Sequence, residues 1–206
     1  MSDQQRTTRP RGYEMRKRAE DVGRTRQRII EAAVHLHGTV GPASTSIAAI
    51  ADRAGVTRLT VYRHFPDESA LFAACSGHWL SRQELPRPEA WSAFDSPVER
   101  LTAGLTDLYR FYRAGEQMLA LVIRDVHAVP QAIREARERM NRRYVEVLAG
   151  AWPDADADAD APVRRAVIGH AAAFTTWRSL CREQGLTDDE AVELMVVLVA
   201  AVGTTS

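Results

Sequence analysis

The chain has 206 residues, of which 45% are hydrophobic and 26% charged, and its formal net charge is zero. Such a composition is typical of a globular protein that buries a hydrophobic core. The longest apolar run, residues 194–203, is far shorter than the roughly 20 residues that a membrane-spanning helix needs. The polar and basic first twenty residues also lack the apolar region of a signal peptide. We therefore expect a cytoplasmic protein.

The charges are distributed unevenly along the chain. Residues 1–66 contain 12 basic and 6 acidic side chains, whereas the remainder contains 15 basic and 21 acidic ones. A basic segment joined to an acidic one is typical of a polyanion-binding module attached to a module that does not bind polyanions. A chance fluctuation in surface charge is the alternative explanation.

The first third of the chain begins with a basic stretch and continues with a helical pattern. Residues 1–22 are rich in arginine and contain almost no large apolar side chains, so we expect a flexible basic arm. A helix is expected to begin at the N-cap Thr25 and to end at Gly41-Pro42. Its expected buried face consists of Ile29, Ile30, Ala33, Val34, Leu36 and Val40.

Two short helices and a tight turn are predicted over residues 46–65. Ser46 and Thr57 are the expected N-caps, and Gly55 can adopt the left-handed conformation that the turn requires. The expected apolar seam between the two helices consists of Ile50, Val56 and Val61, and the small side chains of Ala51 and Ala54 allow the helices to approach closely. This pattern predicts a helix-turn-helix, whose second helix enters the major groove of DNA. A further helix is expected to begin at Asp67 and to include Trp79.

The rest of the chain also has helical periodicity, beginning after a proline-rich turn at residues 85–88. Gly115 is expected to separate two helices, and residues 154–160 are expected to form a loop. We expect five helices here: one that begins at Pro97, one over 118–127, one that begins at Pro130, one over 162–184 and one over 188–203. The last of these has a capping box of Thr187 and Glu190. Because no alternating strand pattern occurs, the predicted fold is all-α with about nine helices.

The region around the helix-turn-helix is similar to the TetR family of transcriptional regulators. The residues that match the family pattern in order and spacing are Ile29-Ile30-Glu31-Ala32-Ala33, Gly41, Ile50-Ala51, Ala54-Gly55-Val56-Thr57 and Tyr62-Arg63-His64-Phe65. The resemblance covers residues 23–83 and implies a DNA-binding domain there, followed by a ligand-binding and dimerisation domain over 84–206. It implies a bacterial repressor that binds double-stranded operator DNA as a homodimer and is released by an unidentified small-molecule effector.

The resemblance also implies which side chains contact DNA. Arg58 and Thr60 are expected to reach base edges, whereas Tyr62, His64 and Ser46 are expected to contact phosphates. The complete predicted set is Ser46, Thr57, Arg58, Thr60, Tyr62, Arg63 and His64. One departure from the family is Glu68, which stands where relatives commonly have a phosphate-binding lysine and would repel DNA. Another is Leu59, which stands where many relatives have a smaller residue, and it is expected either to tilt the recognition helix or to contact a thymine methyl group.

The middle helices contain aromatic and polar side chains that are candidates for the small-molecule site. They are Trp79, Tyr109, Tyr112, Met118, Arg124, His127 and Trp177. Ordinary core or interface packing is the alternative role for each of them. The last two helices, 162–184 and 188–203, are expected to form the homodimer interface, because the final helix is apolar almost all round and must be covered.

Other kinds of chemistry have little support in the sequence. His35 and His37 cannot share a helix face, and the pair Cys75 and His78 is too small to form a metal site. The acidic run at 154–160 lacks the glycine and glutamate of a calcium loop. We expect no metal, no cofactor and no enzymatic activity. The alternative function, a helical enzyme or binding protein with an accessory DNA-binding domain, would be distinguished by a test of binding to the DNA upstream of the chain's own gene.

Overall fold

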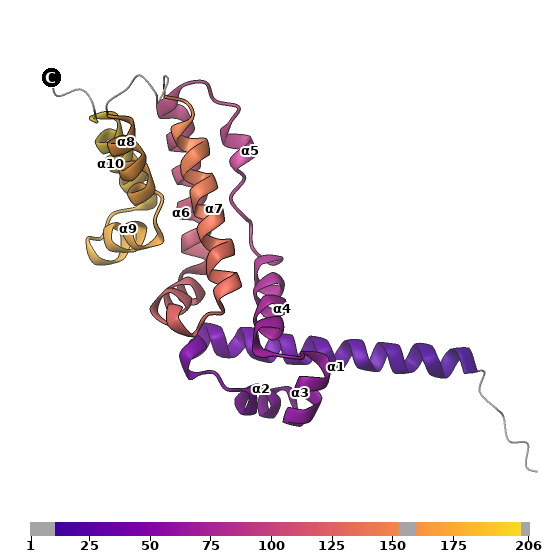
Figure 1. The fold of residues 1–206 in the computed structure, drawn as a ribbon. Helices are drawn as coiled ribbons and strands as arrows, with labels where there is room; N and C mark the ends of the chain where they lie inside the picture. Colours follow the sequence, from indigo (N-terminus) through magenta and orange to yellow (C-terminus); the bar gives the residue numbers. More distant parts are fainter. Residues whose placement is uncertain (1–10, 153–159, 203–206) are drawn as a thin grey trace, which may run out of the picture. The chain divides into compact units, whose positions relative to one another are not determined.

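The computed structural model describes residues 11–152 and 160–202. Over these residues the chain forms ten α-helices and no strand, which confirms the predicted all-α class (Figure 1). The chain divides into two compact units between Trp79 and Leu80, whereas the sequence placed the boundary after residue 83. The expected loop at 154–160 lies almost entirely outside the described residues.

The N-terminal unit is a small helical domain built around α1. Its α-helices are α1 (Arg11–Thr39), α2 (Ile47–Ala54), α3 (Arg58–His64) and α4 (Glu68–Leu80). A short 3-10 turn over Pro42–Ser44 connects α1 to α2. Both α2 and α3 contact α1, and the buried core residues include Ile29, Ile30, Ala33, Ile50, Val61, Phe65, Leu71 and Phe72. Of the six positions of the first helix that were predicted to be buried, Ile29, Ile30 and Ala33 are buried, Val34 and Leu36 are half-buried, and the prediction is wrong for Val40, which is 43% exposed directly after the end of α1.

The first helix is longer than the sequence pattern predicted. It begins at Arg11, so the expectation of a flexible arm over the whole of residues 1–22 is wrong for 11–22, and residues 1–10 lie outside the described part. Thr25 is not an N-cap, because its hydroxyl donates to the carbonyl of Asp21 within the helix (2.9 Å). Side chains 15–22 are all exposed. A helix that is already nucleated can continue without burial when its residues favour helix formation, as Arg, Lys, Glu and Met do.

The C-terminal unit is built around the long helix α6. Its α-helices are α5 (Pro88–Trp91), α6 (Pro97–Arg124), α7 (Gln131–Ala149), α8 (Ala161–Ala171), α9 (Phe174–Arg178) and α10 (Asp188–Ala200), with a 3-10 turn over Val126–Ala128 and a π-helical turn over Ser179–Glu183. Helices α5, α7, α9 and α10 all contact α6. The core includes Trp91, Leu101, Leu105, Leu108, Tyr109, Leu148, Ile168 and Trp177.

The expected break at Gly115 does not occur. Helix α6 continues through this residue to Arg124, and Gly115 is buried on the inward face of the helix. A glycine within a helix costs about 1 kcal/mol relative to alanine but does not end it when tertiary packing favours continuation.

The single helix expected over 162–184 is instead divided into α8, α9 and the π-helical turn. The break lies at Ala172-Ala173. There the hydroxyls of Tyr109 and Tyr112 donate to the carbonyls of Ala171 (2.8 Å) and Ala172 (2.6 Å), respectively. These carbonyls lie at the end of α8, where backbone acceptors lack partners within the helix. Side chains from α6, 60 and 62 residues away in sequence, therefore stabilise a break that the local pattern does not show.

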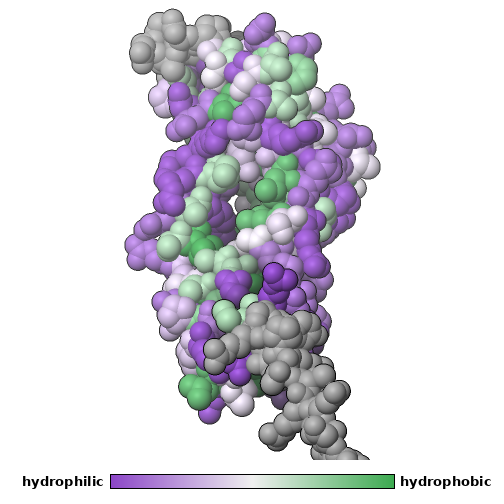
Figure 2. All heavy atoms as spheres, turned by 90° about the vertical axis from the view of Figure 1, so that its right-hand side faces the viewer, coloured by the Kyte–Doolittle hydropathy of each residue, from purple (hydrophilic) through white to green (hydrophobic). Residues whose placement is uncertain are grey.

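The surface is largely hydrophilic. Figure 2 shows one face on which hydrophilic residues predominate and hydrophobic residues form smaller groups. Among the described residues, no helix combines the length and apolar character needed to cross a membrane.

Candidate nucleic-acid interface

The turn between α2 and α3 is formed by the residues that the sequence singled out. The Ser46 hydroxyl accepts a hydrogen bond from the Ala49 amide (3.1 Å), and the Thr57 hydroxyl accepts one from the Thr60 amide (3.2 Å). Gly55 has the left-handed conformation, with φ 63° and ψ 43°. Both predicted N-caps and the predicted turn glycine are confirmed.

Helix α1 supports this motif through two arginine side chains. The Arg26 guanidinium lies over the ring of Phe65, 4.7 Å from its centroid, which is a favourable cation–π arrangement. Arg28 donates to the carbonyl of Gly55 at 3.3 Å. Because Gly55 forms the turn before α3 and Phe65 follows its last residue, α1 contacts the chain on both sides of α3. The sequence analysis did not identify these contacts, since they join residues that are 27 or more positions apart.

The outward face of α3 is formed by side chains that have no packing role within their own unit. Arg58, Leu59, Tyr62 and Arg63 are all exposed, whereas Val61 is buried. This is the division that a helix with 3.6 residues per turn produces. We call these four exposed residues the α3 face. Leu59 is 80% exposed, and the predicted DNA-binding set did not include it, although the same helical periodicity places it among the exposed positions.

Thr57 and Thr60 are less available than the sequence suggested. The two hydroxyls are hydrogen-bonded to each other at 3.0 Å, and Thr60 is half-buried. Thr57 also caps α3 through its hydroxyl. These contacts orient both side chains along the helix start, where Arg58 is the more exposed neighbour.

His64 lies at the edge of the α3 face. Its Nε2 atom is buried, and among the described residues it has no hydrogen-bond partner. Burial, followed by the positive charges of Arg63 and Arg26, holds the pKa of His64 below its ordinary value. The imidazole is therefore neutral at pH 7. The positive charges of Arg63 and Arg26 near it would attract an anion.

Glu68, the departure from the family pattern, is the first residue of α4 and is exposed. The Asp67 carboxylate accepts a hydrogen bond from the Ala70 amide (2.7 Å) and caps this helix. A negative charge in the first turn of a helix is stabilised by the helix dipole. Glu68 therefore has a local structural role in addition to any effect on a bound polyanion.

Behind the motif, a buried histidine–cysteine pair connects α1 to α4. The Sγ atom of Cys75 lies 3.4 Å from Nδ1 of His37, and the His37 ring packs on Phe72. Burial lowers the pKa of His37 to about 4 and raises that of Cys75 to about 12, so both groups are neutral at pH 7. Both cysteines of the chain are free and buried. Among the described residues, no group of three or more His, Cys, Asp or Glu side chains could hold a metal ion.

Three of the seven predicted ligand-binding residues belong to the core of the C-terminal unit. Tyr109 and Trp177 are completely buried and Tyr112 nearly so. Burial raises the pKa of both tyrosine hydroxyls, which donate to the backbone at the end of α8. These side chains have the packing role that the sequence analysis held open as the alternative.

The other four candidates are accessible. Arg124 and His127 are exposed and Met118 is half-buried; these three residues lie in the second half of α6 and the turn after it. Trp79 is half-buried in α4 of the N-terminal unit. Arg124 pairs with the buried Asp125 at 2.7 Å.

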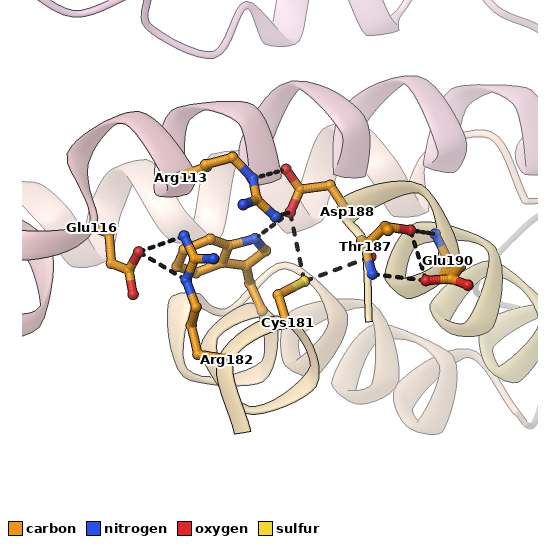
Figure 3. Close-up of polar contacts among 8 residues, drawn as sticks. Arg113, Glu116, Cys181, Arg182, Thr187, Asp188 and Glu190 are labelled. Atoms are coloured by element: carbon orange, nitrogen blue, oxygen red, sulfur yellow. Dashed lines mark hydrogen bonds and ion pairs between the residues drawn. The ribbon is translucent and has the colours of Figure 1, made fainter. Parts of the chain in front are cut away.

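Asp188, the first residue of α10, is at the centre of a polar network that joins α10 to α6 (Figure 3). It accepts hydrogen bonds from Nη2 of Arg113 (2.6 Å), from the Trp177 indole (2.8 Å) and from Cys181 Sγ (3.5 Å). Burial of this carboxyl group favours a higher pKa, but the hydrogen bond from Arg113 and the other donors hold its pKa below the ordinary value.

A second ion pair extends this network. Arg182 donates to Glu116 at 2.6 Å, and its guanidinium lies 5.3 Å from the Trp177 ring centroid. Arg113 approaches the same ring at 5.9 Å. The buried indole thus has a guanidinium from α6 and one from the π-helical turn near it, which fixes the start of α10 relative to α6.

The final helix is covered by its own chain on one side only. Ala191, Val192, Met195 and Val199 are buried in the core. Leu194, Val197 and Leu198 are 39%, 60% and 48% exposed. Of the predicted partner helix 162–184, the segment containing Trp177 is buried within the same unit, whereas α8 has Val163 exposed. Both α10 and α8 thus have exposed apolar side chains.

Comparison with known proteins identifies the family of the N-terminal unit. Residues 29–75 match the family model described as "Bacterial regulatory proteins, tetR family". The HTH-type transcriptional regulator AcrR of Shigella flexneri is 30% identical over 125 residues, which are 61% of this chain and 49% of AcrR. The chain thus spans about half the length of this curated relative.

The fold is similar to those of solved TetR-like structures. NalD, the secondary repressor of the MexAB-OprM multidrug efflux pump in Pseudomonas aeruginosa, superposes with a TM-score of 0.59 at 21% identity, covering 88% of this chain and 96% of NalD. FadR of Bacillus subtilis, a transcriptional regulator in complex with stearoyl-CoA, gives 0.58 at 18%, covering 87% and 99%. At these identities the similarity establishes the fold. The match to the tetR family of bacterial regulatory proteins extends over residues 29–75, which include α2 and α3.

Proposed function

We propose that the chain is a ligand-responsive transcriptional regulator of the bacterial cytoplasm that binds double-stranded operator DNA and represses transcription. The observation that carries this proposal is the α3 face. Arg58, Leu59, Tyr62 and Arg63 project from a helix held by two N-caps and a glycine turn. A helix presented in this way has the size and the hydrogen-bonding side chains needed to read the major groove.

The relatives support this role. AcrR is named as an HTH-type transcriptional regulator, NalD as a repressor, and FadR as a transcriptional regulator in complex with stearoyl-CoA. Repression relieved by a small molecule has no chemical step, so the proposed function requires neither enzymatic activity nor a cofactor.

In the proposed complex, DNA contacts divide between bases and phosphates. Arg58 is exposed at the start of α3 and reads a guanine, with Thr60 beside it. The phosphate contacts come from Ser46, Thr57, Tyr62, Arg63 and His64.

The proposed homodimer forms through α8 and α10. A single α3 makes too few contacts for tight binding, and two recognition helices must lie about 34–36 Å apart to enter successive major grooves. The exposed Leu194, Val197 and Leu198 give α10 a surface that a second copy would cover.

The proposed effector site lies beside the second half of α6. Residues 118–123 are half-buried, and the accessible Met118, Arg124 and His127 belong to this segment or follow it. Tyr112 lies on the same helix and is fixed in the core together with Tyr109 and Trp177. A small molecule bound here shifts the equilibrium between DNA-binding and released forms only by its difference in affinity for the two.

The DNA-binding proposal is tested with the DNA fragment upstream of the chain's own gene, by gel retardation and fluorescence anisotropy. Arg58→Ala should weaken binding to this fragment by about 1–3 kcal/mol while binding to unrelated DNA changes little. Arg142→Ala, which removes an exposed arginine of the C-terminal unit, is the matched control and should leave both affinities unchanged. Equal losses on both DNAs would restrict Arg58 to phosphate contacts, and no specific binding by the wild type would contradict the proposed function.

The dimer proposal is tested by placing a charge on α10. Leu198→Glu should produce a monomer in sedimentation velocity experiments and abolish operator binding, because a carboxylate cannot be buried in an apolar interface without a partner. Leu85→Glu changes a leucine of similar exposure, 43% against 48%, and should remain dimeric. A folded Leu198→Glu monomer that still binds the whole operator tightly would contradict the interface.

A further inference from the structure

Leu59 is the most exposed large hydrophobic side chain of the described residues, at 80%. It lies on the recognition helix, one residue after Arg58. Tyr62 and Arg63 follow it by three and four residues and are therefore its neighbours on the helix surface. The buried Val61 faces the opposite direction. Leu59 thus lies in the middle of the α3 face and contributes nothing to the core of the unit.

An isolated exposed leucine needs no explanation on an ordinary protein surface. Here, however, the exposed part of α3 consists of only four side chains, three of which can form hydrogen bonds: Arg58, Tyr62 and Arg63. The leucine occupies the position between them. If this face enters the major groove, Leu59 is brought against base edges and water is removed from its side chain.

The chemistry of the groove leaves Leu59 one partner. Its side chain has no donor or acceptor, so it cannot recognise the polar edges of guanine, adenine or cytosine. The only apolar group on the major-groove edge of DNA is the C5-methyl of thymine. Against a polar edge, the same side chain would remove water from a donor or acceptor and return no hydrogen bond.

We propose that Leu59 is a specificity-determining residue that contacts the C5-methyl group of one thymine in each operator half-site. This inference rests on the proposed function, since it requires that the α3 face reads DNA. It adds to that function a base preference that arises from an apolar contact and not from a hydrogen bond. Arg58 and Leu59, adjacent in sequence, then select a guanine and a nearby thymine.

The test replaces each thymine of the operator in turn with deoxyuridine, which removes only the methyl group. At one thymine per half-site, wild-type affinity should fall by about fourfold, the loss expected for one buried methyl group. Replacement in both half-sites should lower it by about sixteenfold. Leu59→Ala should bind the unmodified operator more weakly and should show no further loss on the deoxyuridine operator, as a double-mutant cycle requires of two groups in contact.

Leu85→Ala is the matched control, because Leu85 is an exposed leucine outside the N-terminal unit; it should retain the full sensitivity to deoxyuridine. Thermal unfolding should show that Leu59→Ala is folded, since the side chain is not part of the core. Operator binding that is insensitive to every thymine replacement overturns the proposal for Leu59 alone, as does a Leu59→Ala variant that keeps the wild-type sensitivity. Failure of the wild type to bind any specific fragment contradicts the proposed function and this proposal together.

Discussion

The helix boundaries of the helix-turn-helix and those of the C-terminal unit depend on contacts of different range. In the N-terminal unit, the caps of α2 and α3 and the turn at Gly55 join residues that are at most five positions apart. In the C-terminal unit, the decisive contacts join distant residues, as in the pair of Arg113 with Asp188, 75 positions apart. Short-range contacts leave a recognisable pattern in the sequence, whereas long-range contacts depend on the complete fold.

The largest expected effect concerns the long-range contacts of the C-terminal unit. Trp177 is completely buried and its indole donates to Asp188. Trp177→Ala should lower the free energy of unfolding by about 3–5 kcal/mol, because it opens a cavity and leaves the half-buried Asp188 carboxylate with one donor fewer. Urea unfolding followed by circular dichroism measures the loss. Leu85→Ala should change it by less than about 0.5 kcal/mol, and an equally small loss for Trp177→Ala would show that the network is not important for stability.

The N-terminal unit should respond to acid through His37. Burial lowers the pKa of this residue to about 4 in the folded chain, against an ordinary value of 6.5. Above pH 6.5 the group is neutral in both states. Between pH 6.5 and 4 only the unfolded chain takes up the proton, so stability should fall with pH by about 3 kcal/mol in total, and no further below pH 4. Urea unfolding between pH 7.5 and 4 measures this loss.

His37→Phe provides the control for this acid response. Phenylalanine can keep the ring contact with Phe72 and has no titratable group. The variant should therefore lack this part of the pH dependence while the effect of other groups remains. Identical pH profiles for the variant and the wild type would refute the assignment to His37.

The same difference in range explains what could be predicted from the sequence. The caps Ser46 and Thr57 and the turn glycine were predictable because each needs only its neighbours. The division of 162–184 at Ala172 was not, since the tyrosine hydroxyls that stabilise it come from α6. The start of α1 at Arg11 was missed because an exposed helix has no buried face to produce a periodic pattern.

The candidate site follows the same rule. Arg58, Tyr62 and Arg63 were identified and are exposed on α3, and so is Leu59, which the sequence singled out as a departure from the family. The support of the motif by Arg26 and Arg28 depends on how α1 packs against it, which no local pattern shows. In the C-terminal unit, aromatic residues at helical spacing suggested a ligand site, but three of them are core residues. Residues that line a ligand site and residues that pack in a core have the same helical spacing, so the spacing could not distinguish the two roles.

The same change, glycine to alanine, tests a local backbone constraint in the N-terminal unit and a long-range packing constraint in the C-terminal unit. Gly55→Ala places a Cβ at an ordinary van der Waals distance, 3.9 Å, from Nη2 of Arg28, but at a φ of 63°. The cost should be about 1–2 kcal/mol and purely conformational. Gly104→Ala is within helix α6, where alanine is favoured, but its Cβ would lie 2.3 Å from Cδ2 of Leu148. It should cost about 1–3 kcal/mol through overpacking.

Second substitutions distinguish the two causes. Gly55→Asn should be less harmful than Gly55→Ala, since asparagine tolerates the left-handed conformation better. Leu148→Ala should be less destabilising in the Gly104→Ala background than alone, because the new methyl group occupies part of the vacated space. Both comparisons use the free energy of unfolding in urea. If asparagine is as costly as alanine at position 55, or if the effects at 104 and 148 are additive, the proposed cause at that site is wrong.

The smallest expected effect concerns one acidic residue in the first turn of a helix in each unit. Glu68 begins α4 and Glu99 lies in the first turn of α6, and both are exposed. Replacing either with lysine should lower stability by about 0.3–1 kcal/mol, since each loses a favourable interaction with its helix dipole. Only Glu68→Lys should also tighten binding to all DNA sequences, because a lysine near the α3 face neutralises one more phosphate. The slope of log affinity against log salt should then steepen by about 0.9 for each α3 face engaged. The Glu99→Lys slope should equal that of the wild type, and an unchanged slope for Glu68→Lys would place residue 68 away from the DNA backbone.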